Sequence, residues 1–216
     1  MESPFAEKFN YNILDDDFLA VLRETSGREK DNLPILRPNS AALYKVLLGA
    51  VRPSKILEAG TCQGYSSIFA AKALLSAGCS DFRIDTIELD GNNCERARQN
   101  IKAAGLENKI HLIEGDCVEV FSCLSGVYDM IFIDSSKGHY IDMYGDIVRL
   151  LRTGGMLICD DVTYYGKIEE EPENSPHKHR TIVGRLRAFL DKVKTGGDFV
   201  SCIDMMDDGL LLAVKL

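Results

Sequence analysis

Apolar and polar residues occur along this chain in blocks that predict strands alternating with helices. Short apolar runs bounded by glycine or charged residues favour buried strands, and longer stretches with a helical apolar period favour amphipathic helices. Strands are predicted near residues 55–59, 83–90, 110–114, 128–134, 156–160, 199–203 and 210–215. Helices are predicted near 68–75, 94–104, 117–124, 140–151 and 181–194. This alternation predicts a doubly wound α/β sheet, whose ligands bind beyond the carboxyl ends of the strands.

Two segments between these elements have no strong apolar period. Thr153-Gly-Gly155 is expected to cap the preceding helix and turn the chain into the strand at 156–160. Residues 169–176, Glu-Glu-Glu-Pro-Glu-Asn-Ser-Pro, are expected to form an exposed loop.

The first predicted strand enters a glycine turn, in the sequence Lys-Ile-Leu-Glu-Ala-Gly-Thr-Cys-Gln-Gly-Tyr-Ser-Ser at 55–67. Its spacing, Glu58-x-Gly60-x-x-x-Gly64, lacks the G-x-G-x-x-G pattern of a dinucleotide site. Such an acidic glycine loop suits adenosine with a positively charged amino-acid tail, as in S-adenosylmethionine. Glu88 ends the next strand, where a carboxylate can accept ribose hydroxyls. The alternative for Glu88 is a helix N-terminal acid, a role that Asp90 can fill instead.

Three carboxylates follow two later strands. Asp134 ends the fourth predicted strand, and Asp160 and Asp161 end the fifth. If these strands are adjacent and parallel, their carboxyl ends bring the three groups together, and like charges repel unless a cation or protons neutralise them. Oxygen ligands select a hard cation, Mg²⁺ or else Mn²⁺ or Ca²⁺. The alternative is that some of these residues cap the following helices.

Composition narrows the class of protein. The 216 residues are 45% hydrophobic and can bury a full core without disulfides or metals. The seven cysteines form no C-x-x-C pair, which indicates reduced thiols in the cytosol. The acidic N-terminal stretch is unlike a secretory signal, and no apolar run approaches a membrane span, so we expect a cytoplasmic protein without membrane association. The formal net charge of −8 argues against broad nonspecific nucleic-acid binding.

Together these motifs resemble the cation-dependent O-methyltransferases of the catechol and caffeoyl-CoA type, from about Asn32 to Leu216. The resemblance rests on five stretches of the sequence: Leu57-Glu-Ala-Gly-Thr-Cys-Gln-Gly-Tyr-Ser66, Ile87-Glu88, Asp129-Met-Ile-Phe-Ile-Asp-Ser-Ser-Lys137, Gly154-Gly155 and Cys159-Asp-Asp-Val162. It implies a single domain over residues 1–216, with a helical cap segment at 1–50 and a Rossmann-like core at 51–216. The implied fold is that of a class I S-adenosylmethionine-dependent methyltransferase, a mostly parallel seven-stranded sheet with its last strand antiparallel and helices on both faces. A homodimer is expected.

The resemblance also implies a set of site residues. The expected cofactor-binding residues are Leu36, Glu58, Gly60, Ser66, Glu88, Asp116, Cys117 and Asp134. Asp116 and Cys117 would lie near the adenine, and Leu36 in a segment that closes over the methionine moiety. The expected metal ligands are Asp134, Asp160 and Asp161. Asp134 would therefore touch both the metal and the amino group of the cofactor.

Lys137, three residues after Asp134, resembles the general base of the family. A free lysine has a pKa near 10.4, so a base at this position needs a lower pKa, which a nearby dication would provide. A solvated surface lysine is the alternative, and His139 is a second candidate base. Tyr140 is expected to pack in a helix.

Two departures from the family pattern stand out. Asp161 replaces the usual third metal ligand, an Asn, and Asp207 replaces the first glycine of a closing Gly-Asp-Gly motif. The first departure changes the charge at the metal. The second leaves the structure of the loop before the last strand open.

The acceptor is open between two classes. One is a catechol-like small molecule with two adjacent hydroxyls, and the other is tRNA carrying 5-hydroxyuridine at the wobble position. Bacterial members of the family, some of which act on tRNA, look most similar at 32–36 and 178–187. A phosphate-binding surface could be formed by Lys178, Arg180, Arg185, Arg187, Lys192 and Lys194. These residues could equally be the solvated face of an amphipathic helix. A noncatalytic cofactor-binding protein would be expected to lose Lys137 or the carboxylates.

Overall fold

The computed structural model describes residues 16–28, 36–170 and 176–216, which fall into two compact units. The first unit is Met1–Gly115 and the second is Asp116–Leu216. Leu33, Pro34 and Ile35 of the predicted methionine-closing segment, and residues 171–175 of the predicted acidic loop, lie outside the described residues. No helix in the described ranges is long and apolar enough to cross a membrane.

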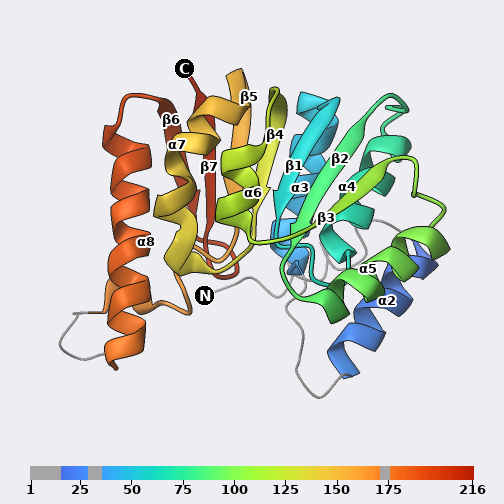
Figure 1. Ribbon diagram of the computed structural model, residues 1–216, viewed down its shortest axis with the longest axis horizontal. Helices are drawn as coiled ribbons and strands as arrows, with labels where there is room; N and C mark the ends of the chain where they lie inside the picture. Colours follow the sequence, from blue (N-terminus) through green and yellow to red (C-terminus); the bar gives the residue numbers. More distant parts are fainter. Residues whose placement is uncertain (1–15, 29–35, 171–175) are drawn as a thin grey trace. The chain divides into compact units, whose positions relative to one another are not determined.

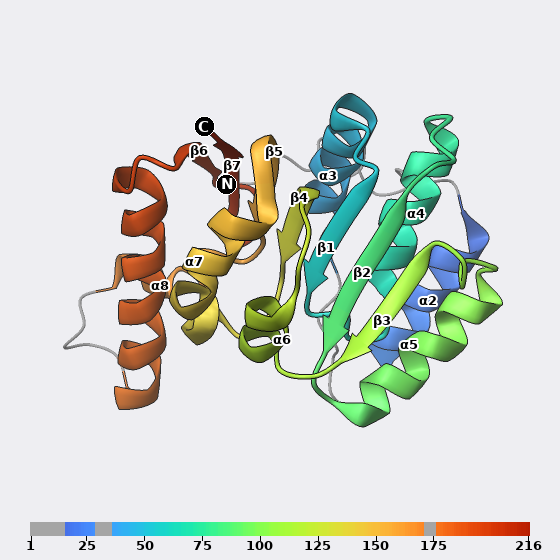
Figure 2. The same cartoon turned by 45° about the horizontal axis from the view of Figure 1, so that its top comes forward.

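The first unit alternates helices and parallel strands, as the sequence pattern predicts. Its elements are α2 (Asp17–Arg28), α3 (Pro38–Val51), β1 (Lys55–Ala59), α4 (Tyr65–Ser76), β2 (Arg83–Glu88), α5 (Gly91–Ala103) and β3 (Ile110–Glu114). The strands β1, β2 and β3 lie side by side in parallel register, with Glu58 opposite Thr86 and Glu88 opposite Glu114 (Figure 2). This register brings the carboxyl ends of the three strands to one edge.

The helices of the first unit bury an apolar interior against its strands. Ile56 and Leu57 of β1 and Ile68 and Leu74 of α4 have no exposed surface. Burial of each such side chain contributes roughly 1.5–3 kcal/mol relative to exposure. The described residues of the predicted 1–50 cap segment form α2 and α3, which both contact α4.

The second unit joins a parallel strand pair to an antiparallel one. Its elements are α6 (Cys117–Cys123), β4 (Tyr128–Ile133), the 3₁₀ turn η1 (Lys137–His139), α7 (Tyr140–Leu150), β5 (Leu151–Cys159), η2 (Lys167–Glu169), α8 (His177–Thr195), β6 (Phe199–Asp204) and β7 (Leu210–Lys215). β4 pairs with β5 in parallel, and β7 runs antiparallel between β5 and β6. In Figure 1 the long helix α8 lies next to α7, in agreement with the contacts between them.

One local prediction in this unit is wrong. Thr153-Gly-Gly155 does not precede the fifth strand as a turn but lies inside β5, which begins at Leu151. The register passes from Tyr128–Leu151 to Met130–Met156, so β5 bulges against β4. Gly154 has a φ of +71°, and a Cβ on Gly155 would lie 2.8 Å from the Arg152 carbonyl oxygen. Only glycine fits so crowded a bulge, and the same residues mimic a turn in sequence.

The remaining elements follow the prediction, with small shifts at their ends. The helix predicted from Thr181 begins at His177, and the predicted apolar stripe includes the buried residues Val183, Leu186 and Phe189. Part of the predicted acidic loop is the short turn η2. The predicted fold class is confirmed: the chain is α/β, with seven mostly parallel strands and an antiparallel last strand.

Candidate active site

The glycine turn (residues 60–64) follows β1 and begins α4. Gly60 and Gly64 have φ of +101° and +86°, and Cys62 is also left-handed at +48°. The amides of Gly60 and Thr61 donate to the Ile87 carbonyl at 3.0 and 3.1 Å, which ties the turn to β2. Glycine allows the two sharpest positions at no steric cost. The turn therefore lies at the carboxyl end of two parallel strands, where the sequence places the cofactor.

Glu58, a predicted cofactor residue, is buried below this turn with 1% of its surface exposed. Its carboxylate accepts hydrogen bonds from the Ser67 hydroxyl and, at 2.5 Å, from the Thr86 hydroxyl. Thr61 is 2.6 Å from Thr86 and joins the same group. A buried carboxylate is stable only when such donors satisfy it. Glu58 thus connects β1, β2 and the first turn of α4.

Glu88 lies at the end of β2, as predicted, and contacts the glycine turn directly. One carboxylate oxygen accepts from the Cys62 amide at 2.7 Å, and the other from the Asp90 amide at 2.9 Å. Asp90 is the N-cap of α5 and accepts from the amides of Asn92 and Asn93, so its predicted capping role is confirmed. The ribose role of Glu88 stays a prediction.

The other predicted cofactor residues of the first unit lie at the start of α3 and α4. Ser66 is in the first turn of α4 and is partly exposed. Leu36 is 3% exposed, and its carbonyl accepts from Arg23 at 3.2 Å. The same guanidinium donates to the Tyr65 hydroxyl at 2.7 Å. Arg23 therefore connects Leu36 to the residue next to Ser66.

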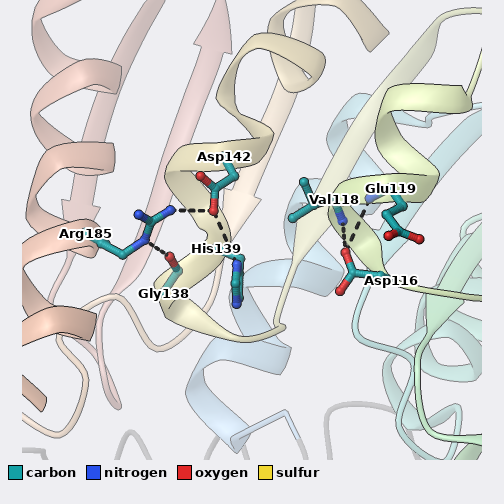
Figure 3. Close-up of polar contacts among 7 residues, drawn as sticks. All are labelled: Asp116, Val118, Glu119, Gly138, His139, Asp142 and Arg185. Atoms are coloured by element: carbon teal, nitrogen blue, oxygen red, sulfur yellow. Dashed lines mark hydrogen bonds and ion pairs between the residues drawn. The ribbon is translucent and has the colours of Figure 1, made fainter. Parts of the chain in front are cut away.

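Asp116 and Cys117 begin α6 in the second unit. The Asp116 carboxylate caps this helix by accepting from the amides of Val118 at 2.8 Å and Glu119 at 3.3 Å (Figure 3). The sequence did not predict this capping role. The predicted cofactor residues are divided between the two units, and adenine binding by Asp116 and Cys117 stays a prediction.

The three predicted metal ligands all lie in the second unit, at the ends of β4 and β5. Ile133 and Cys159 are paired in register, and the Asp160 amide donates to the Ile133 carbonyl at 2.9 Å. Asp134 and Asp160 therefore follow adjacent parallel strands, as the sequence analysis expects. Asp161 donates its amide to the Asp160 carboxylate at 3.0 Å and has a φ of +54°. Asn and Asp are the side chains that best tolerate this left-handed region, so either type suits position 161.

These carboxylates interact strongly through their charges. Asp160 is 3% exposed, and burial raises its pKa to about 7, with further contributions from the negative charges of Asp134 and Asp161. Like charges in a buried site favour a proton or a cation. The oxygen donors fit a hard divalent cation. In the described part of the chain, however, no three His, Cys, Asp or Glu side chains are already arranged to hold a metal ion.

Lys137, the predicted base, begins the turn η1 after β4, and its side chain is 11% exposed. Its ammonium donates to the Asp134 carboxylate at 2.7 Å and lies 5.7 Å from the centre of the Tyr140 ring. Burial by itself lowers the pKa of Lys137. Its interactions with Tyr140, Asp134 and Asp161 outweigh burial and raise this pKa above the usual value. Lys137 is therefore not a surface lysine, and with Asp134 as its partner it is held in the charged form.

His139, the rival base, lies on the exposed side of η1. Its ring nitrogen is 3.3 Å from the Asp142 carboxylate, which also pairs with Arg185 (Figure 3). Arg185 lowers the pKa of Asp142. Tyr140 is fully buried and packs edge-on against Phe189, which confirms the predicted packing role.

Sequence reasoning missed Asp208 and Thr163. Asp208, in the turn before β7, is 4% exposed, and its carboxylate accepts from the Thr163 hydroxyl and from the Tyr165 amide at 2.7 Å. These residues belong to two distant stretches, and an Asp in a turn resembles any exposed turn residue. The only signal was the Gly-Asp-Gly motif that the resemblance implies around Asp207, whose φ of +52° lies in the region that glycine adopts most readily.

Fold and site together define a class: an α/β nucleotide-binding enzyme with a glycine turn after its first strand and carboxylates after its fourth and fifth. A family model described as O-methyltransferase matches residues 9–216, and the chain belongs to this family. The resemblance identified in the sequence is confirmed. With it the enzyme class is confirmed as an S-adenosylmethionine-dependent O-methyltransferase.

Several relatives agree with this assignment. A catechol O-methyltransferase from Niastella koreensis is 32% identical over 163 residues, which cover 73% of this chain and 72% of the relative. Caffeoyl-CoA O-methyltransferase 5 from Nicotiana tabacum is 27% identical over 202 residues, covering 90% and 82%. A solved structure from Staphylococcus aureus has 27% identity and a TM-score of 0.86, with 98% of this chain and 100% of that chain covered.

Solved structures with a bound cofactor share the fold. The O-methyltransferase TomG from Streptomyces achromogenes, in complex with S-adenosylmethionine, has a TM-score of 0.83 at 24% identity. The alignment covers 100% of this chain and 99% of TomG.

Proposed function

We propose that this enzyme transfers the methyl group of S-adenosylmethionine to a hydroxyl of a small catechol-like acceptor, with the help of a divalent cation held by Asp134, Asp160 and Asp161. One observation carries the proposal: three carboxylates follow two adjacent parallel strands, and burial, together with the charges of Asp134 and Asp161, raises the pKa of Asp160 to about 7. A bound dication would neutralise this cluster, orient two adjacent acceptor oxygens and acidify the attacking hydroxyl.

Lys137 can act as the base only if its salt bridge with Asp134 is released. The Asp134 carboxylate cannot fully coordinate a cation and pair with the Lys137 ammonium at the same time. If Asp134 held the cation, Lys137 would lose this partner, and burial would then favour its neutral form. Neutral Lys137 takes the acceptor proton while the C–S bond of the sulfonium breaks and the new C–O bond forms. The sulfonium methyl is already activated, so in-line positioning supplies much of the remaining catalysis.

The first unit supplies most of the proposed cofactor residues. Glu58 accepts from Thr86, which in turn bonds Thr61 of the glycine turn, and Glu88 accepts from the Cys62 amide of the same turn. The Glu88 carboxylate has lone pairs beyond its two amide bonds and can accept ribose hydroxyls. Asp116 and Cys117 are proposed to contact the adenine, and Leu36 the methionine moiety.

A small-molecule acceptor is favoured over tRNA for two reasons. The relatives reported above are catechol and caffeoyl-CoA O-methyltransferases. In addition, the two best-placed arginines of α8 already have partners inside the second unit. Arg185 donates to the Gly138 carbonyl and pairs with Asp142, and Arg187 donates to the carbonyls of Ile168 and Glu170. Arginines with such partners are less available for phosphates.

The test measures transfer of a labelled methyl group from S-adenosylmethionine to a catechol panel and to hydroxyuridine-containing tRNA. Chelator should abolish transfer, and readdition of Mg²⁺ or Mn²⁺ should restore it. Full activity in chelator would rule out the cation. Methylation of tRNA but of no catechol would replace the proposed acceptor and leave the cation in place.

A further inference from the structure

The loop that carries Asp161 has an unusual backbone. We define the strand-end loop as residues 161–166, which follow Asp160 at the end of β5. Three of its residues that are not glycine are left-handed: Asp161, Tyr164 and Tyr165, with φ of +54°, +50° and +58°. A left-handed residue other than glycine costs roughly 1–2 kcal/mol. Such a conformation persists only where its surroundings determine it, and it tends to occur at functional sites.

Packing alone does not account for this conformation. A pocket of about 280 Å³ lies beside Val162 and Thr163. Its other walls come from η2, α8 and the region at the end of β6. A cavity leaves the adjoining residues without close contacts on that side. The strand-end loop also contacts the turn between β6 and β7, through hydrogen bonds from Val162 and Thr163.

That turn holds the loop through polar contacts centred on Asp208. The Thr163 amide donates to the Asp208 carbonyl at 2.9 Å, and the Val162 amide to the Gly209 carbonyl at 3.0 Å. The Asp208 carboxylate accepts from the Thr163 hydroxyl and from the Tyr165 amide. Hydrogen bonds to a charged acceptor are roughly twice as strong as neutral ones. Gly209 permits the approach, since a Cβ there would lie 2.5 Å from Thr163.

We propose that Asp208 is a positioning residue of the methyltransferase site, because it holds the strand-end loop in the conformation that presents Asp161 to the cation. This inference rests on the proposed cation dependence. Asp208 lies 47 positions after Asp161 in the sequence and touches neither substrate nor metal in this scheme. Outer groups that orient metal ligands typically contribute about 10–100-fold in metal affinity or activity.

The experiment measures Mn²⁺ affinity of the full chain by titration calorimetry, for the wild type and for Asp208→Asn. Asn has a similar shape, but its single acceptor oxygen carries no charge, so the hydrogen bonds from Thr163 and Tyr165 become neutral and weaker, and the Tyr165 amide loses its second acceptor oxygen. We expect Mn²⁺ affinity to fall about tenfold. The matched control is Asp204→Asn at the end of β6, whose carboxylate accepts only from the Met206 amide at 2.8 Å among the contacts described. This control should bind Mn²⁺ as the wild type does.

A second pair of variants guards against a folding defect in Asp208→Asn. Thr163→Val removes the hydroxyl donor to Asp208, and Thr163→Ser keeps it. We expect weaker Mn²⁺ binding in Thr163→Val and near wild-type binding in Thr163→Ser. Equal affinity in Asp208→Asn and the wild type, or an equal loss in Asp204→Asn, would overturn the positioning role.

Hydrogen exchange separates this inference from the proposed function. In metal-free protein, Asp208→Asn should raise amide exchange in a peptide that covers 160–168, and Asp204→Asn should not. If the wild type binds no Mn²⁺, the cation proposal fails, and exchange alone tests whether Asp208 holds the strand-end loop. Unchanged exchange in Asp208→Asn would overturn the inference.

Discussion

The two acidic regions of this enzyme use their carboxylates in opposite ways. In the first unit, Glu58 and Glu88 accept hydrogen bonds from hydroxyls and amides around the glycine turn. In the second unit, Asp160 is buried near the negative charges of Asp134 and Asp161, and burial first and these charges second raise its pKa to about 7. Carboxylates that accept hydrogen bonds from the protein hold a loop in place. Carboxylates that repel one another destabilise the empty site, and a bound cation or proton removes this repulsion.

The two regions also differ in which residues take up left-handed backbone conformations. The glycine turn has glycine at its two sharpest positions, whereas the strand-end loop places Asp161, Tyr164 and Tyr165 in the left-handed region. Both loops are held by distant residues: the glycine turn by Ile87 and Glu88 of β2, and the strand-end loop by Asp208 and Gly209. The difference is that glycine removes the steric cost at the two sharpest positions of the first loop, whereas the left-handed positions of the second loop are not glycine.

The largest expected effect tests the electrostatic half of this comparison. Asp160→Asn should lower methyl transfer by more than about 100-fold, beyond the range for outer-shell groups, because it removes a proposed ligand. The same variant should stabilise the metal-free protein at high pH. In the wild type, the pKa of Asp160 in the folded state, about 7, exceeds its usual value of 3.8. Wild-type stability therefore falls as pH rises from about 4 through about 7.

The pKa difference of about three units corresponds to a gain of about 4 kcal/mol above pH 7, at about 1.4 kcal/mol per unit, and the gain should disappear near pH 4. Urea unfolding in chelator across this pH range measures it. The control is Asp142→Asn. Arg185 lowers the pKa of Asp142, so its contribution is present at neutral pH and is lost as pH falls. A pH-independent difference between Asp160→Asn and the wild type would contradict the account.

The next largest effect is expected at Glu58, and it tests whether the carboxylates of the first unit stabilise the fold through their hydrogen bonds. Glu58→Ala leaves the hydroxyls of Ser67 and Thr86 without their acceptor in a buried site. We expect a loss of roughly 2–4 kcal/mol in unfolding free energy, since each buried group left unpaired costs about 1–3 kcal/mol. Urea denaturation is the measurement. Glu114→Gln removes an exposed pair with Arg98 and should leave stability close to that of the wild type. Equal losses in the two variants would contradict the role of Glu58.

A smaller effect is expected at Glu88, which combines a structural and a proposed binding role. Glu88→Ala should weaken S-adenosylmethionine binding by roughly 1–3 kcal/mol, the range for unpaired hydrogen-bonding groups. Calorimetric titration of the cofactor measures it. Asp90→Ser keeps an N-cap on α5 and serves as the control, with unchanged cofactor affinity. If Glu88→Ala binds the cofactor as tightly as the wild type, Glu88 has only a structural role.

The smallest effect is expected at Asp161, where this chain departs from its family. Asp161→Asn keeps a residue that tolerates the left-handed φ and removes one negative charge. We expect it to need more metal for half-maximal activity. The pH–rate profile should shift to lower pH, because the charge of Asp161 contributes to the raised pKa of Lys137. Profiles at saturating metal test this. A rising limb that stays in place or moves to higher pH would contradict the electrostatic account.

Local patterns made most of the fold predictable. Apolar runs such as Tyr128–Ile133 can only be buried strands in this context, and Asp90 is a recognisable N-cap. Asp134 and Asp160 each follow one of these strands. Because β4 and β5 are adjacent and parallel, their ends lie at the same edge, and the two residues come together there. The sequence failed where one pattern fits two structures, as at Gly154 and Gly155, where a bulge and a turn both need glycine.

The unpredicted parts of the site depend on contacts between distant segments. Nothing near Asp208 in the sequence indicates that its carboxylate reaches Thr163 and Tyr165. The salt bridge of Lys137 with Asp134 was also not foreseen, because an i,i+3 pair after a strand forms only if the turn η1 brings the side chains together. The homodimer, the cytoplasmic location and the division into a cap segment and a core stay predictions.

The bulge in β5 has a consequence for how insertions and deletions would act on this enzyme. Between its two registered pairs the chain advances two residues on β4 and five on β5. Side chains of a strand alternate between the two faces of the sheet. The number of extra residues in the bulge therefore decides which face each later side chain of β5 points to. Deleting one glycine while Leu151 keeps its partner would turn Met156–Asp160 to the opposite face. The position of Asp160 therefore depends on a residue count five or six places upstream, in a stretch without chemistry of its own.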